Sequence, residues 1–226
     1  VDIVLNAPKI PYRETITAIG DGHYRHKKQT GGHGQFAEVY LKISPNPNGY
    51  EFKNDIFGGS IPRNFIPAVE KGVQEAMLKG PLAGCVVQNV TVSVYDGKHH
   101  EVDSSEMSFK IAARAAFRDA MSKAKPILLE PIYRVKVIIP DEYMGDITGD
   151  LNHKRGRILG MSVEEGMQVV NAEVPLAEMS KYASELRSMT QGKGSFEMEF
   201  DRYEMVPSNV AKNIIDAYKA SQTEEE

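Results

Sequence analysis

The sequence predicts an α+β protein made of two successive domains. Strand-like alternating segments and amphipathic helical segments are mixed along the chain, and clusters of turn residues separate them. The order of elements then restarts after Lys125-Pro126. With 226 residues, 41% of them hydrophobic, the chain can bury one large core or two modest ones.

Extended segments joined by glycines are expected over residues 12–44, which are rich in Thr, Val, Tyr and Ile. Asn46-Pro47-Asn48-Gly49 is typical of a turn. Pro67 suits the first turn of a helix, and Gly80 stands where that helix would stop. The buried face of this helix is predicted to contain Val69, Val73, Ala76 and Met77.

Val86 to Tyr95 alternates and is β-branched, which predicts a strand, and Asp96-Gly97 is then expected to turn the chain. A helix is predicted from Ser104 to Met121, with Asp103 and Glu106 as a pair resembling a capping box. One side of this Ala-rich helix would contain Phe109, Ala112, Ala113 and Ala116, and its small side chains predict close packing on a sheet.

The second half predicts strand 132–139, helix 142–152, strand 157–163, strand 167–174, helix 176–187 and strand 195–200. This β-α-β-β-α-β order is that of the ferredoxin-like, split βαβ arrangement. A last helix is expected over residues 209–220, followed by an acidic end.

Charge is distributed unevenly along the chain. Residues 1–126 carry 16 Lys and Arg against 13 Asp and Glu, whereas residues 127–226 carry 11 against 18. Any contact with RNA must therefore be made by a local basic element, because charges beyond a Debye length of roughly 8 Å are screened. No apolar run is long enough for a membrane span, and the single cysteine, Cys85, is predicted to be a small hydrophobic residue.

The most informative segment is Tyr24 to Gln35, a basic strand that leads into a glycine-rich tip without any acidic residue. Lys and Arg can neutralise phosphates, glycines allow close backbone approach, and the Gln35 amide can pair with a base or ribose edge. A solvated hairpin whose glycines serve only the turn explains the composition equally well.

A second loop, Asp96 to Asp103, contains His99 and His100 just before a predicted helix. A neutral, hydrogen-bonding histidine near RNA is one interpretation, and solvent-exposed decoration is the other. A P-loop motif is absent from the sequence, and the histidines lack the cysteine partners and spacing typical of zinc sites.

In the second domain, Asn152 to Arg157 places three fixed cations at the end of a predicted helix, and Gly156 is expected to take the left-handed conformation that terminates it. These cations could bind phosphate. They could equally serve stability by complementing the helix dipole.

Several long motifs together resemble translation elongation factor G, in family order and over nearly the whole chain. They are Tyr12 to Ile16, Lys27 to Phe36 (KKQTGGHGQF), Ile66 to Gly72, Tyr95 to Gly97 with His100 to Glu106, Glu142 to Asp146, Gly149 to Asn152, Val174 to Met179, Leu186 to Ser188 and Thr190 to Gly192. The non-methionine start and the missing P-loop agree with a fragment that lacks the family's GTPase domain.

This resemblance implies a domain organisation. Residues 1–8 would end the preceding domain, 9–126 would form domain IV with the fold of ribosomal protein S5 domain 2, and 127–206 would form a ferredoxin-like domain V. Residues 207–226 would provide a C-terminal helix that packs back on domain IV. The chain itself would have no catalytic centre, metal or cofactor, while GTP and Mg²⁺ would belong to the parent protein.

The resemblance also implies function: a cytoplasmic, monomeric translocase whose domain IV tip enters the A site of the small ribosomal subunit while tRNA and mRNA move, with 16S and 23S rRNA as further partners. The tip residues implied to bind RNA are Lys27, Lys28, Gln29, Thr30, Gly31, Gly32, His33, Gly34, Gln35, Lys98, His99 and His100. His100 stands at the position of the modified histidine of the eukaryotic counterpart. The residues implied to contact rRNA from domain V are Asn152, His153, Lys154 and Arg155.

The tip departs from the usual family pattern at two places. His33 stands where arginine is common, and Lys98-His99 stands where Ser-Tyr is common. One fixed cation is lost and another appears nearby, which leaves open a paralogue that acts mainly in ribosome recycling. Two more hypotheses compete with the translocase: a ribosome-protection protein, and a metal-dependent or acid/base enzyme that uses His23, His26, His99, His100 and Glu101.

Overall fold

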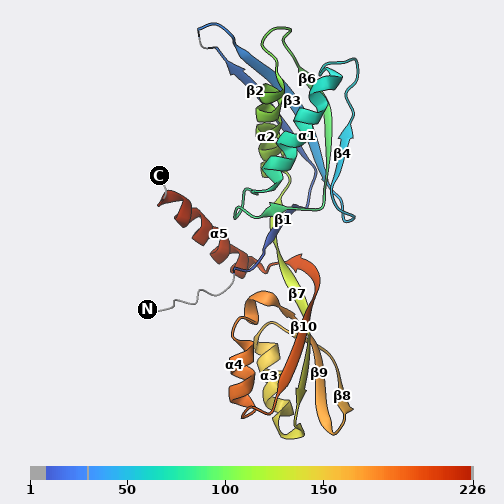
Figure 1. Cartoon of the computed structure of the whole chain (residues 1–226), viewed down its shortest axis with the longest axis vertical. Helices are drawn as coiled ribbons and strands as arrows, with labels where there is room; N and C mark the ends of the chain where they lie inside the picture. The colour runs from blue at the N-terminus through green and yellow to red at the C-terminus, as the bar shows by residue number, and fades with distance from the viewer. Residues whose placement is uncertain (1–8, 30, 225–226) are drawn as a thin grey trace. The chain divides into compact units, whose positions relative to one another are not determined.

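The computed structural model describes residues 9–29 and 31–224, which form two compact units (Figure 1). The first unit contains residues 13–128 and 206–224, and the second contains residues 9–12 and 129–205. Each unit has its own cluster of buried hydrophobic residues. The predicted α+β class is confirmed, since both units combine helices with a β-sheet.

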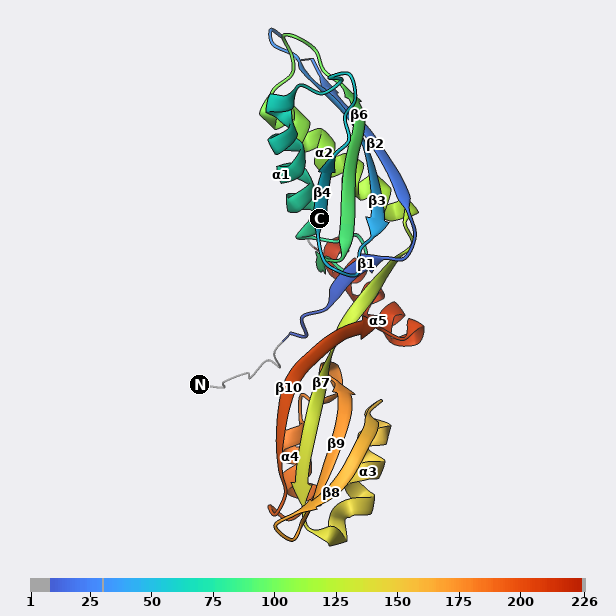
Figure 2. The same ribbon diagram turned by 90° about the vertical axis from the view of Figure 1, so that its right-hand side faces the viewer.

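The first unit is built on a four-stranded sheet in the order β2-β3-β6-β4. Its strands are β2 (Gly20–Lys28), β3 (Gln35–Pro45), β4 (Glu51–Asn54) and β6 (Val90–Lys98). The first three in spatial order are antiparallel neighbours, while β4 runs parallel to β6. Helices α1 (Ile66–Met77) and α2 (Glu106–Lys123) lie together on one face of the sheet (Figures 1 and 2).

Smaller elements complete the first unit. They are the parallel pair β1 (Arg13–Ile16) and β5 (Val86–Val87), the 3-10 turn η1 (Arg63–Phe65) and the C-terminal helix α5 (Ser208–Thr223). Helix α5 touches the loop before β5, where a Cβ on Gly84 would lie 2.8 Å from the Tyr218 ring. Strand β7 (Pro126–Ile139) begins in the first unit and continues into the second.

The core of the first unit lies between its sheet and its two main helices. Alternate residues of β3, from Ala37 to Ile43, are fully buried, as expected for a strand with one covered face. Small side chains on α2 allow close packing on β2. The two elements approach so closely that a Cβ on Gly22 would overlap the Ala116 carbonyl oxygen. The predicted buried face of α1 is confirmed at Val69, Val73, Ala76 and Met77.

The second unit has the predicted β-α-β-β-α-β order and an antiparallel sheet in the order β10-β7-β9-β8 (Figure 2). Besides β7, it contains α3 (Met144–His153), β8 (Arg157–Glu164), β9 (Met167–Pro175), α4 (Tyr182–Met189) and β10 (Ser195–Met205). The predicted helices 142–152 and 176–187 both start as 3-10 turns, η2 (Asp141–Tyr143) and η3 (Leu176–Glu178), so α4 begins six residues later than predicted. Among the described residues, no helix has the length and apolar character needed to cross a membrane.

The predicted turn at Asp96-Gly97 is wrong, because both residues belong to β6. The β3–β6 register shifts between Tyr40 and Leu41, so β6 continues past a bulge instead of turning. Gly97 is needed for a different reason: a Cβ there would overlap the Glu38 carbonyl oxygen and lie 2.6 Å from the Ile61 side chain. A glycine in a strand can therefore mark a close approach of two backbones as well as a turn.

The predicted cap of α2 is also wrong. Ser105 is the N-cap: its hydroxyl accepts a hydrogen bond from the Ser108 backbone N–H, and the Ser108 hydroxyl accepts one from the Ser105 N–H. Asp103 precedes the cap, and Glu106 is the first residue of the helix. The capping box therefore starts two residues later than predicted.

Candidate nucleic-acid interface

The basic segment forms one arm of a β-hairpin. Strands β2 and β3 pair over nine positions, from Gly20 opposite Ile43 to Lys28 opposite Gln35. Gly31 and Gly32 lie in the turn at positive φ, with nothing within 4 Å of a Cβ built on either. These two glycines therefore serve backbone conformation, and the open space around them leaves the turn accessible.

The second loop, residues 99–105, begins where β6 ends and lies beside the hairpin. The Phe36 N–H donates to the Asp103 carbonyl oxygen at 2.9 Å, and the Ser104 hydroxyl donates to the Phe36 carbonyl oxygen at 2.7 Å. A Cβ on Gly34 would lie 2.9 Å from the Asp103 carboxylate. In two perpendicular views, both loops lie at the same end of the sheet (Figures 1 and 2).

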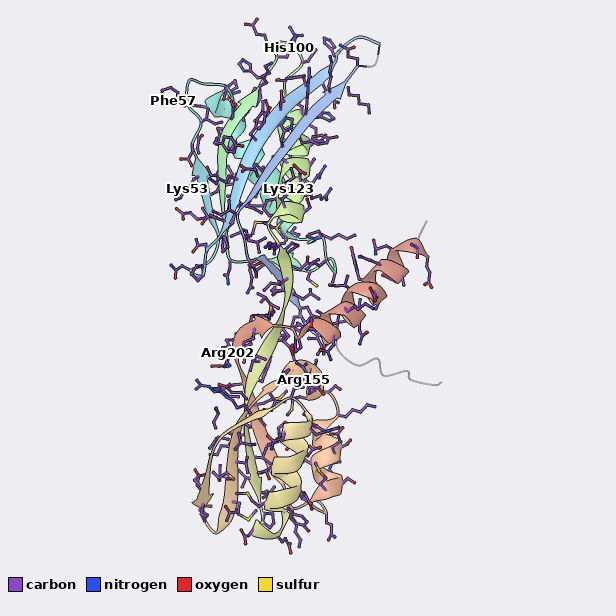
Figure 3. The ribbon with its side chains drawn as sticks, turned by 180° about the vertical axis from the view of Figure 1, so that it is seen from behind. Lys53, Phe57, His100, Lys123, Arg155 and Arg202 are labelled. Atoms are coloured by element: carbon purple, nitrogen blue, oxygen red, sulfur yellow. The ribbon has the colours of Figure 1, made fainter. Side chains whose placement is uncertain are left out.

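His100 is held by its own loop while its side chain remains exposed (Figure 3). Its Nδ1 accepts hydrogen bonds from the backbone N–H groups of Val102 at 3.3 Å and Asp103 at 3.2 Å. Backbone N–H groups can only donate, so a ring that accepts these bonds at Nδ1 bears its proton on Nε2; Nδ1 also lies 3.6 Å from an Asp103 carboxylate oxygen. The ring therefore presents an N–H donor on the side away from its loop.

Residues from both loops line one pocket of about 320 Å³. Its predicted members are Lys27, Gln29, Gln35, Lys98, His99 and His100. Lys28, Gly31, Gly32 and His33 are exposed nearby in the chain, and Gly34 is half-buried against Asp103. Thr30 lies outside the described residues.

Three further residues line the same pocket and were missed as site residues: Arg25, Phe36 and Asp103. The Arg25 guanidinium carbon lies 5.3 Å from the centroid of the Phe36 ring. The pairing register of the hairpin could have identified Arg25 and Phe36. Lys28 opposite Gln35 places Lys27 opposite Phe36, and Arg25, two residues before Lys27, then projects from the same face. Asp103 could be placed there only by tertiary packing.

The histidines considered for metal or acid/base chemistry have separate partners. His23 Nε2 lies 2.7 Å from a Glu38 carboxylate oxygen, and His26 Nε2 lies 2.9 Å from the Gln35 amide oxygen. His99 Nδ1 lies 3.2 Å from the Ser60 carbonyl oxygen. In the described part of the chain, no three His, Cys, Asp or Glu side chains are grouped as metal ligands.

The basic cluster of the second unit is engaged in internal ion pairs. Lys154 is 9% exposed, and its ammonium lies 3.0 Å from Asp150 and 2.6 Å from Glu185. Arg155 forms two hydrogen bonds to the buried Glu130 carboxylate, at 2.8 and 3.1 Å. Of the four residues expected to contact rRNA, Asn152 and His153 are exposed.

The end of α3 differs from the prediction at Gly156. The left-handed residue is Arg155, with φ of 57°, and Gly156 is not among the positive-φ residues. Gly156 donates its N–H to the Leu151 carbonyl oxygen at 2.9 Å, and a Cβ there would lie 2.5 Å from the same oxygen. The glycine thus permits close approach, while the arginine bears the unusual backbone conformation.

Two protein-family models match the chain in succession. The model described as elongation factor G, domain IV, matches residues 8–125, and the model described as elongation factor G C-terminus matches residues 127–214. The fold and these matches define a segment of a translation factor. The chain belongs to the elongation factor G family.

Individual relatives agree with this assignment. An elongation factor G-like protein from Thermotoga maritima is 52% identical over 229 residues, which cover 100% of this chain and 34% of the relative. A crystal structure of a Thermus thermophilus protein matches with a TM-score of 0.87 and 47% identity, covering 95% of this chain and 32% of that one. The chain thus spans about a third of the length of these relatives.

Proposed function

We propose that this chain is the part of a ribosomal translocase that contacts the tRNA–mRNA pair in the A site of the small ribosomal subunit. The observation that carries the proposal is the meeting of two loops at one end of the first unit's sheet, joined by the Phe36–Asp103 and Ser104–Phe36 hydrogen bonds. Because these bonds fix the loops to each other, cations from one loop and hydrogen-bond donors from the other can meet the same RNA.

The role of the chain is mechanical in this proposal. Gln35 and His100 would donate hydrogen bonds that hold the codon–anticodon pair in frame, while the exposed lysines neutralise phosphates. GTP and Mg²⁺ would bind to a GTPase domain of the parent protein, and this chain would carry no catalytic residue. The expected partners are 16S and 23S rRNA, tRNA and mRNA, and the parent protein would act as a cytoplasmic monomer.

The proposal is tested by His100→Ala in the intact parent protein. We expect translocation to slow about tenfold, which corresponds to losing one hydrogen bond of about 1.4 kcal/mol. Ribosome-stimulated GTP hydrolysis should be unchanged, because His100 is outside the GTPase domain. Pre-steady-state fluorescence of labelled mRNA measures the first rate, and phosphate release measures the second.

Two further variants make this test specific. His100→Gln should retain part of the translocation rate, because its amide N–H can replace the Nε2 donor. Lys123→Ala removes an exposed cation in the same unit, away from His100 (Figure 3), and should leave both rates unchanged. Translocation by His100→Ala at the wild-type rate would contradict the proposed role of the tip.

A second candidate is a role mainly in ribosome recycling. It is favoured by the unusual tip residues His33, Lys98 and His99 and by the relative that is described as elongation factor G-like. A ribosome-splitting assay with the parent protein separates the two roles. Splitting without detectable translocation would support recycling.

A further inference from the structure

Three cations lie around one residue of the open sheet face, the face opposite α1 and α2. Arg25 on β2 and Lys98 on β6 are paired in register with the same β3 residue, Glu38, from its two sides. Lys27 lies two residues further along β2, opposite Phe36. Because alternate residues of a strand point to the same face, the three side chains project from one surface.

These cations are available to a ligand. Within the described residues, Arg25, Lys27 and Lys98 form no ion pair within 4 Å, in contrast to Lys154 and Arg155 of the second unit. The carboxylate between them, Glu38, is largely buried. It accepts a hydrogen bond from the Tyr40 hydroxyl at 3.2 Å and lies 2.7 Å from His23 Nε2.

The pocket beside these cations has the size and lining of a small-ligand site. Its volume of about 320 Å³ is at the small end of the roughly 300–1,000 Å³ typical of ligand sites, which suits a single nucleotide. The Gln29 amide supplies a donor and an acceptor at its wall, whereas the Gln35 amide oxygen already lies 2.9 Å from His26 Nε2. The Arg25 guanidinium, held over the Phe36 ring, supplies a planar stacking surface.

We propose that this pocket binds one unpaired nucleotide of a single-stranded RNA. Its phosphate would lie between Lys27 and Lys98, its base would stack on the Arg25 guanidinium, and the Gln29 amide would meet the base edge. Phe36 is a positioning residue in this site, because it orients Arg25. A paired base cannot enter, since its stacking surfaces and pairing edge are already occupied.

The inference rests on the proposed function in one respect: RNA reaches the pocket because the tip enters a ribosomal site. It adds a preference for unpaired nucleotides and assigns roles to Arg25 and Phe36. Both can be measured with the 226-residue chain alone.

The test is fluorescence anisotropy with three labelled RNA probes: a single-stranded hexanucleotide, the same sequence in a duplex, and an abasic single strand. We expect the wild-type chain to bind the hexanucleotide at least about fivefold more tightly than the other two, given the usual strength of base stacking on protein side chains. Equal affinity for the hexanucleotide and the abasic strand would reduce the site to phosphate binding and overturn the proposal. No measurable binding at millimolar protein in low salt would also overturn it.

Variants separate stacking from charge. Arg25→Lys keeps the positive charge but removes the planar guanidinium on which the base would stack. It should therefore weaken hexanucleotide binding roughly fivefold without changing the salt dependence. Lys27→Gln removes one of the two cations assigned to the phosphate, so it should instead lower the slope of log affinity against log salt by about 0.7. Phe36→Leu should resemble Arg25→Lys, and thermal unfolding checks that it folds.

The matched control is Lys53→Gln, which removes a cation from β4 of the same sheet, away from His100 (Figure 3). It should bind all probes like the wild type. An Arg25→Lys chain that binds like the wild type would overturn the stacking role. If these binding results hold but His100→Ala translocates at the wild-type rate, the proposed function is wrong and the nucleotide pocket remains supported. If His100→Ala slows translocation but the binding results fail, only the nucleotide pocket is wrong.

Discussion

Glu14 organises the loop between α1 and β5 although it is a charged residue with no exposed surface. Its carboxylate accepts backbone hydrogen bonds from Leu82 at 2.7 Å, Ala83 at 3.1 Å and Cys85 at 2.8 Å. A buried carboxylate is tolerated when donors surround it, and these three N–H groups meet that condition. Gly80 makes room, because a Cβ there would lie 2.5 Å from a Glu14 carboxylate oxygen.

The same neighbourhood explains the character of Cys85. Burial, and then the nearby Glu14 carboxylate, raise the pKa of its thiol to about 11. The thiol therefore stays protonated near neutral pH, where a reactive cysteine would be a thiolate. Cys85 is half-buried, so the expected small hydrophobic residue is less enclosed than a core position.

Replacing Glu14 with Gln should lower the free energy of unfolding by about 2–4 kcal/mol. The neutral amide weakens the charge-assisted hydrogen bonds and directs an N–H₂ group at a backbone N–H. Urea unfolding followed by circular dichroism measures the change. Glu51→Gln is the control, because this exposed carboxylate makes only a 3.9 Å contact with Lys53; equal stability of the two variants would contradict the role of Glu14.

Helix α2 shows how an element's start is chosen by its cap. Ser108 is fully buried, and its hydroxyl donates to the Ser105 carbonyl oxygen at 2.8 Å while accepting from the Ser105 N–H. The sequence predicted Asp103 as the N-cap, because Glu106 follows it at the spacing of a capping box. In the structure, the Asp103 carboxylate lies against Gly34 in the pocket. The tip loop therefore determines which residue remains to cap the helix.

Ser105→Ala should destabilise the chain by about 1 kcal/mol, the usual cost of removing an N-cap. Asp103→Asn should cost less, because it leaves the cap intact. The two variants are compared by their urea midpoints at constant slope. A larger loss for Asp103→Asn than for Ser105→Ala would mean that the earlier residue supports the start of the helix.

At the scale of the whole molecule, the chain contains two hydrophobic cores that share no residue. Val39 belongs to the core of the first unit, and Val170 belongs to that of the second. Both valines are fully buried. Substitutions at such separated sites are expected to act independently.

Val39→Ala should therefore increase amide hydrogen exchange mainly in residues 13–128 and 206–224, and Val170→Ala mainly in residues 129–205. Each change is expected to cost about 2 kcal/mol, from lost burial and the cavity left behind. Hydrogen exchange followed by mass spectrometry resolves the two regions. Equal acceleration of both regions by either variant would show that the two cores unfold together.

Several features of the fold were predictable because they depend on neighbours in sequence. The buried face of α1 follows from helical periodicity, the β2–β3 hairpin follows from two extended segments around glycines, and the second unit follows from its order of elements. The basic tip was visible in the sequence for the same reason.

Tertiary structure decided the features that depend on contacts between distant residues. The turn predicted at Gly97 became a close approach to Glu38, and the expected surface cations Lys154 and Arg155 became internal ion pairs. The pocket requires loops about 70 residues apart to share hydrogen bonds, as between Ser104 and Phe36. Composition and periodicity identify which residues carry charge and which face of an element is apolar, but folding alone brings a particular carboxylate or backbone to a given side chain.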